Sequence, residues 1–301
     1  MNSTEGGEIR TFPELDLTCP PAGYSETGRL SPLNAAIYCA LALHVLVDLV
    51  LLVLPWQFVD AFAVLTPVLA WPMSQNGLIA VWAATRGRSS YWRYVAVVAG
   101  AAWTWFVAIV VMPDVAIRGH VSAGWAVAFA AQSITIVLAV AAYRLLRQWN
   151  RLRMGDRLER RRLQFGVGSL LMWTTLIAAT LGFGRAGFLQ FGWTSGVVYW
   201  EFFVFMPVLG ACSAVYALVV LFCLASREQF AVRAVLAAAT IVAFGYLQLH
   251  VQQSLFGSPT ALAAPATWIL TGSQTAWLCA TLLPLGLLRW TERARRFSSV
   301  N

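Results

Sequence analysis

Two ionisable side chains, His44 and Asp48, stand four residues apart within the first long apolar stretch of the chain. On an α-helix this spacing places both on one face, where a carboxylate can accept the imidazole N–H. Such a pair could relay protons, bind a substrate or help to hold a metal ion. It could equally be a buried structural pair that joins helices. The two interpretations carry about equal weight on the sequence alone.

A few other polar side chains are expected at a similar depth. Gln248, His250 and Gln274 fall in later apolar stretches, and Glu201 lies where the sixth expected span enters from the outer side. With His44 and Asp48 they form a candidate polar cluster around one outward-facing pocket. Interhelical hydrogen bonds, each worth about 0.6–2 kcal/mol, are the preferred interpretation for His250 and for the glutamines. Glu201 is expected to reach interfacial water.

Ser74, Gln75 and Asn76 also lie within an apolar stretch, between Pro72 and Gly77. Proline removes a backbone N–H, so this segment could be a broken helix of the kind that forms transport sites. A kink whose free backbone groups are capped by these side chains explains the pattern equally well.

The elements that must position these side chains are apolar stretches of membrane-crossing length. The chain is 59% hydrophobic and only 11% charged, whereas a soluble domain has about 25% charged residues. A hydrocarbon core about 30 Å thick requires roughly 20 helical residues. The sequence therefore predicts an all-α fold, a polytopic transmembrane helical bundle of about eight spans. The spans are expected near residues 34–54, 61–83, 94–112, 122–143, 164–183, 203–224, 234–254 and 267–288.

All 21 basic residues are arginine, and most of them fall in alternate connectors and in the C-terminal tail. The connectors on the other side hold only Arg118 and Arg185. Short cytoplasmic connectors retain basic residues, so this bias places both termini in the cytoplasm. The expected organisation is a polar, acidic and uncleaved cytoplasmic tail over residues 1–31, a transmembrane domain over 32–288, and a basic cytoplasmic tail over 289–301.

The fourth and fifth expected spans are joined by a strongly basic connector, residues 144–163. Leu145, Trp149 and Leu152 recur there at helical intervals between basic residues, so the connector could lie along the inner leaflet and bind anionic lipid. A solvated connector that only sets topology is the simpler interpretation. Its candidate lipid-interface residues are Arg147, Arg151, Arg153, Arg157, Arg160, Arg161 and Arg162.

Small residues spaced four apart predict close helix packing in lipid. They are Ala96, Gly100 and Thr104 in the third expected span, Gly210 and Ala214 in the sixth, and Ala239 and Ala243 in the seventh. Enzyme signatures are missing: the sequence has no His-Glu-x-x-His, no Gly-x-Ser-x-Gly and no phosphate loop. It predicts no catalytic residue, no metal site and no cofactor. A nucleic-acid partner is not expected, because the arginines are explained by membrane threading.

The passage that opens with Gln164 and Phe165 and continues through SLLMWTTLIAATLG resembles a motif, Gln-Phe-Ser-Leu-Arg-x-Leu-Leu-x-x-Thr-Thr-Leu-x-Ala. That motif opens a span in many bacterial multi-span integral membrane proteins of uncharacterised activity. Here Gly166, Val167 and Gly168 replace its Ser, Leu and Arg. The passage QNGLIAVWAATRGRSSYWR, residues 75–93, is similar to a span-to-connector passage of the same group. The resemblance implies a multi-pass protein of the bacterial inner membrane and transfers no activity.

Three functions are compatible with these features. The first is a non-enzymatic membrane component or assembly subunit that packs with another membrane protein or with a second copy of itself. The alternative is a small transporter or permease subunit that uses an outward-facing polar pocket near Asp48. An intramembrane enzyme ranks third.

Overall fold

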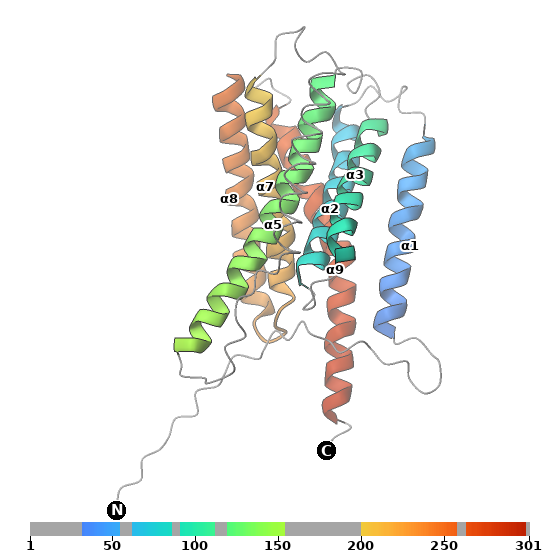
Figure 1. Ribbon diagram of the computed structural model, residues 1–301, viewed down its shortest axis with the longest axis vertical. Helices are drawn as coiled ribbons and strands as arrows, with labels where there is room; N and C mark the ends of the chain where they lie inside the picture. The colour runs from blue at the N-terminus through green and yellow to red at the C-terminus, as the bar shows by residue number, and fades with distance from the viewer. Residues whose placement is uncertain are drawn as a thin grey trace, which may run out of the picture.

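The computed structural model describes residues 32–54, 62–85, 91–111, 119–153, 200–257 and 263–298, and every regular element in these ranges is an α-helix. The helices lie side by side in a bundle (Figure 1). The predicted all-helical bundle is therefore confirmed for the described part of the chain. The helices are α1 (Pro32–Val53), α2 (Phe62–Thr85), α3 (Tyr91–Val111), α5 (Gly119–Arg153), α7 (Trp200–Cys223), α8 (Phe230–Phe256) and α9 (Ala263–Ser298).

Several of these helices are long enough to cross a membrane. Among the described residues, four apolar helical segments are long enough to cross a bilayer, and α3 adds a shorter one over Val95–Val111. Such lengths match the roughly 20 residues that a hydrocarbon core requires. The four are Pro32–Val53, Val121–Leu146, Phe203–Cys223 and Phe230–Phe256.

The direction of the helices bears on how often the chain crosses the bundle. Both α5 and α7 begin at the upper end of Figure 1 and finish at the lower end. The last residue of α5 and the first residue of α7 therefore lie at opposite ends of the bundle. The fifth expected span, 164–183, and the motif that begins at Gln164 lie between α5 and α7 in the chain, outside the described residues.

Helix α2 occupies the centre of the described bundle, where it packs against α3, α5, α7 and α9. Every residue from 71 to 77 is buried. Two prolines, Pro67 and Pro72, lie inside α2, yet the helix is continuous from Phe62 to Thr85. A broken helix at Ser74–Asn76 is thus the wrong interpretation, because neighbouring helices supply partners for the polar groups there.

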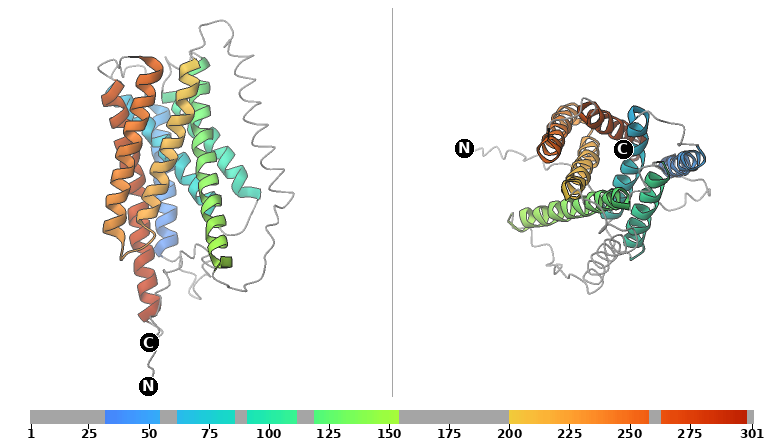
Figure 2. Two further views of the ribbon diagram at one scale, coloured as in Figure 1. Left: turned by 90° about the vertical axis from the view of Figure 1, so that its left-hand side faces the viewer. Right: turned by 90° about the horizontal axis from the view of Figure 1, so that it is seen from above.

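By contrast, α1 and α8 lie at the periphery, as the view from above shows (Figure 2). Large apolar side chains on both remain exposed, among them Leu46 and Val53 on α1 and Val235 and Leu247 on α8. In a bilayer such surfaces contact acyl chains, so they carry no penalty of exposure to water.

Close helix approach depends on glycine at two of the expected positions. A Cβ on Gly210 of α7 would clash with the carbonyl oxygen of Ala128 on α5, and one on Gly100 would lie 2.7 Å from Cδ1 of Ile79. These contacts confirm the predicted small-residue packing in α3 and α7. Ala239 and Ala243 are instead exposed on α8.

Charged side chains cap helix ends at the lower end of the bundle. Arg144 donates to the carbonyl of Thr85, the last residue of α2, at 2.8 Å, and Arg233 donates to the carbonyl of Phe222 near the end of α7 at 3.3 Å. The backbone N–H of Leu33 donates to Glu292 at 3.0 Å. Each contact pairs a charge with the helix terminus of opposite partial charge.

Helices α5 and α9 continue beyond the level of these capped helix ends. Residues 144–153 form the last turns of α5, and residues 289–298 form the last turns of α9. The expected basic connector and the expected C-terminal tail thus begin as continuations of membrane-depth helices.

We predict that Gly210→Ala destabilises the protein by about 1–3 kcal/mol, because the added methyl group meets backbone that cannot yield without moving α5 away from α7. Gly272→Ala is the matched control, since nothing lies within 4 Å of a Cβ at that position. Unfolding in detergent measures both. Equal stability of the two variants would contradict the predicted contact.

Candidate functional site at Asp48

The carboxylate of Asp48 is the buried charge at the centre of the candidate site, with only 3% of the residue exposed. Its Oδ1 accepts hydrogen bonds from Trp71 Nε1 at 2.8 Å and from Gln75 Nε2 at 2.9 Å. Its Oδ2 accepts one from Trp103 Nε1 at 2.7 Å. Hydrogen bonds to an ionised acceptor are roughly twice as strong as neutral ones. Three such bonds therefore hold the carboxylate within the bundle.

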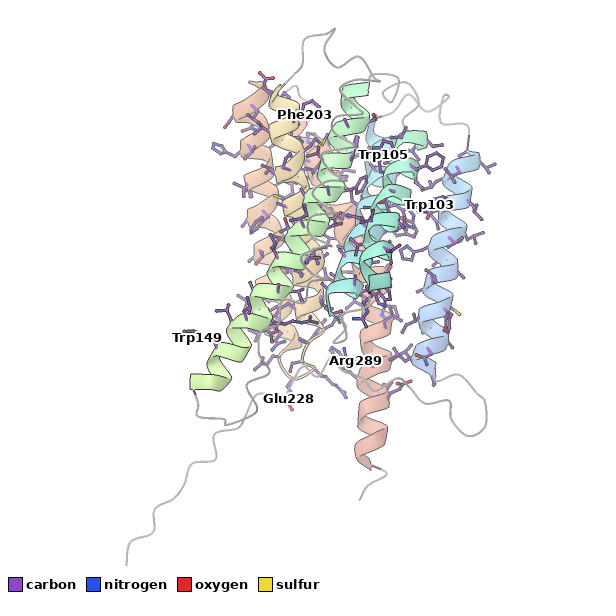
Figure 3. The ribbon with its side chains drawn as sticks, viewed as in Figure 1. Trp103, Trp105, Trp149, Phe203, Glu228 and Arg289 are labelled. Atoms are coloured by element: carbon purple, nitrogen blue, oxygen red, sulfur yellow. The ribbon has the colours of Figure 1, made fainter. Side chains whose placement is uncertain are left out.

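Helical spacing explains how these donors converge. Trp71 and Gln75 are four residues apart on α2, so both side chains leave the same face of that helix. Trp103 reaches the carboxylate from α3, and Figure 3 shows it on the side of α3 that faces α1. The three bonds thus join α1 to α2 and α3 at a single point.

His44 does not make the predicted bond to Asp48, whose oxygens accept indole and amide N–H groups instead. The imidazole Nε2 lies 3.2 Å from the hydroxyl of Thr281 on α9. That hydroxyl donates its own hydrogen to the carbonyl of Trp277 at 3.0 Å, so His44 is the donor in the contact. The ring also stacks on Trp71, with centroids 4.4 Å apart.

The amide of Gln75 is only partly satisfied. Its Nε2 donates to Asp48, but its Oε1 is buried and has no hydrogen-bond partner. A buried acceptor without a donor carries a desolvation penalty of about 1–3 kcal/mol. Among the described residues around Asp48, this oxygen is the feature that favours a role beyond helix packing.

A second polar group joins α2 to α5. Asn76 Nδ2 donates to Gln132 Oε1 at 2.9 Å and to the carbonyl of Phe129 at 3.0 Å. Gln132 Nε2 donates back to the carbonyl of Met73 at 2.9 Å, and Ser133 donates to Asn76 Oδ1 at 3.2 Å. The two amide side chains are thus satisfied by each other and by backbone.

A third group joins α2 to α9 and α9 to α7. Ser74 donates to its own helix at Ala70, at 2.7 Å, and to the carbonyl of Gln274 at 3.2 Å. Ser213 of α7 donates to Gln274 Oε1 at 3.0 Å. Residues 71–76 of α2 are hereafter called the α2 polar segment. Within about one and a half helical turns, this segment is hydrogen-bonded to α1, α5 and α9.

The other residues of the predicted cluster do not join Asp48. Gln274 is buried on α9 but bonds Ser213. Gln248 is buried on α8, and His250 is exposed on the same helix. Glu201 is half-buried in the first turn of α7. Helix α8 packs against α7 and α9, whereas α1 packs against α3 and α9. The described residues thus form separate polar groups.

The predicted lipid-interface arginines fall into two sets. Arg147, Arg151 and Arg153 belong to the last turns of α5. The remaining four lie outside the described residues: Arg157, Arg160, Arg161 and Arg162.

The donors to Asp48 were not among the residues predicted from the sequence. Trp71 and Trp103 lie within apolar helices, away from the membrane interfaces that tryptophan prefers. An indole N–H at that depth needs an acceptor, and Asp48 is the only acidic residue in the first expected span. The presence of indole donors and a single carboxylate within the membrane-depth stretches could have indicated these hydrogen bonds.

Comparison with known proteins adds no relative. No protein-family model, no curated protein and no solved structure matches the chain.

We predict that Trp103→Phe lowers the free energy of unfolding more in the native chain than in an Asp48→Asn background. The asparagine side chain in that background retains an oxygen for Trp71 and Gln75, but its amide nitrogen cannot accept the indole N–H of Trp103. The two costs should differ by about 1–3 kcal/mol in the free energy of unfolding. The loss of aromatic area is the same in both backgrounds, so an identical cost would mean that the indole does not bond the carboxylate.

Proposed function

We propose that the chain is an integral membrane protein with eight spans and both termini in the cytoplasm, in the inner membrane of a bacterium. The four membrane-length apolar helices support the embedding. The shared direction of α5 and α7 supports a further crossing between them. The arginine-rich ends of α5 and α9 lie at one end of the bundle, which is the end expected to face the cytoplasm.

Within that membrane we propose a non-enzymatic role, as a membrane component or assembly subunit. One observation carries this proposal: the polar side chains of the α2 polar segment are used to join helices. Gln132, Asn76 and Gln274 are almost completely buried. Side chains committed in this way stabilise a scaffold and are not free to bind a solute.

The exposed surface of α8 supports the assembly role. Ala239 and Ala243 lie on its exposed side, one helical turn apart, where a second helix could approach closely. The proposed partner is another membrane protein or a second copy of this chain.

A small transporter or permease subunit is the second candidate. The buried carboxylate of Asp48 and the unpartnered Oε1 of Gln75 favour it, because intramembrane ionisable groups often mark solute or proton pathways. The separation of Asp48 from His250 reduces support for a pocket that contains both.

Thiol labelling separates the two candidates. In a chain without native cysteines, single cysteines are placed at Asp48, Gln248 and Gln274, which are each no more than 3% exposed. A scaffold predicts that a membrane-impermeant maleimide labels none of them in intact cells or in inverted vesicles. Labelling at position 48 from the outer side alone would instead support a transport pathway.

Glu228→Cys is the positive control, because Glu228 is exposed in the turn between α7 and α8. The proposed topology predicts labelling of this cysteine in inverted vesicles but not in intact cells. Labelling in intact cells would contradict the proposed orientation and leave the accessibility of position 48 to be judged separately.

A further inference from the structure

We propose that the last turns of α5, residues 143–153, bind the headgroups of anionic phospholipid at one face of the membrane. These residues are called the α5 extension. The inference rests on the proposed membrane embedding and names a partner for it.

The α5 extension continues beyond the helix next to it. Arg144 reaches the carbonyl of Thr85, where α2 ends. From that level α5 continues to Arg153, a further distance of about 13 Å at the usual helical rise per residue. In the view from above, α5 runs sideways and its end lies away from the other described helices (Figure 2). The extension therefore has little cover from the described bundle.

Large apolar side chains of the extension are exposed. The exposed fractions are 65% for Leu146 and 64% for Trp149, and Tyr143 reaches 53%. Trp149 points away from the bundle in Figure 3. This surface continues that of Leu138, which is exposed within the membrane-crossing part of α5. Tyrosine and tryptophan favour the boundary between headgroups and acyl chains, so the same lipid leaflet can cover both parts.

The positive charge of the α5 extension favours lipids with anionic headgroups. The helical register places Arg147 and Arg151 on the same face as Arg144, at spacings of three and seven residues. No acidic residue occurs anywhere in α5. Guanidinium groups match phosphate oxygens in bidentate geometry. A positive face beside an apolar, aromatic one is the pattern of helices that lie at anionic membrane surfaces.

The test uses the full chain reconstituted in vesicles of equal parts phosphatidylcholine and phosphatidylglycerol. After flotation, the protein is released into detergent and its retained lipids are counted by native mass spectrometry. We expect several-fold more phosphatidylglycerol than phosphatidylcholine on the native chain. The variant Arg147→Gln/Arg151→Gln should lose most of this preference, and Trp149→Ala should lower total retention with the arginines intact.

The matched control is Arg295→Gln/Arg296→Gln, which removes the same charge from the end of α9. It should keep the preference. Equal binding of both lipids by the native chain, or an equal loss in the two arginine variants, would overturn the proposed site. Failure of the chain to float with the vesicles would instead contradict the membrane embedding on which the inference rests.

Discussion

The hydrogen bonds between the Asp48 carboxylate and three N–H groups are the interaction on which the position of α1 depends. Lipid chains are as apolar as leucine, so helices in a bilayer gain little from the hydrophobic effect when they meet. Most of the surface of α1 is apolar and exposed, and its described neighbours are few. Trp71, Gln75 and Trp103 add directional hydrogen bonds to the apolar cluster that Leu51 of α1 forms with Trp71, Val107 and Val111.

The same logic extends through the α2 polar segment to the rest of the bundle. Asn76 with Gln132 fixes α2 on α5, and Ser74 with Gln274 fixes α2 on α9. The close approach of Gly210 to Ala128 then fixes α7 on α5. Polar groups are expensive at membrane depth unless they are paired. A central helix that pairs them in several directions is the physical basis for proposing a scaffold.

The sequence predicted the class of fold because membrane-crossing length is a local property. Observed α1, Pro32–Val53, lies close to the expected 34–54. The lengths of α5 and α9 were underestimated from the sequence, since their observed bounds are Gly119–Arg153 and Ala263–Ser298. Hydropathy follows the thickness of the hydrocarbon, whereas backbone hydrogen bonds continue a helix into the arginine-rich turns beyond it.

The site was harder to predict because its partners come from different helices. The spacing of His44 and Asp48 correctly indicated a shared face of α1, but spacing within a helix does not reveal what the facing helices contribute. The carboxylate of Asp48 accepts hydrogen bonds from Trp71 and Trp103, and the imidazole of His44 contacts the hydroxyl of Thr281 instead. Gln248, His250 and Glu201 were predicted to lie near Asp48 because their expected membrane depths are similar. In the described bundle they belong to α7 and α8, which do not pack against α1.

Distance measurements between spin labels test the role of Asp48 most directly. One label replaces Leu46 on α1 and the other replaces Val242 on α8, since both side chains are exposed. A reference pair replaces Leu138 on α5 and Val242. We expect a narrow distance distribution for both pairs in the native chain. In Asp48→Leu we expect a broad distribution for the α1 pair alone. An α1 distribution that stays narrow in Asp48→Leu would contradict the claim that the carboxylate holds α1 in place.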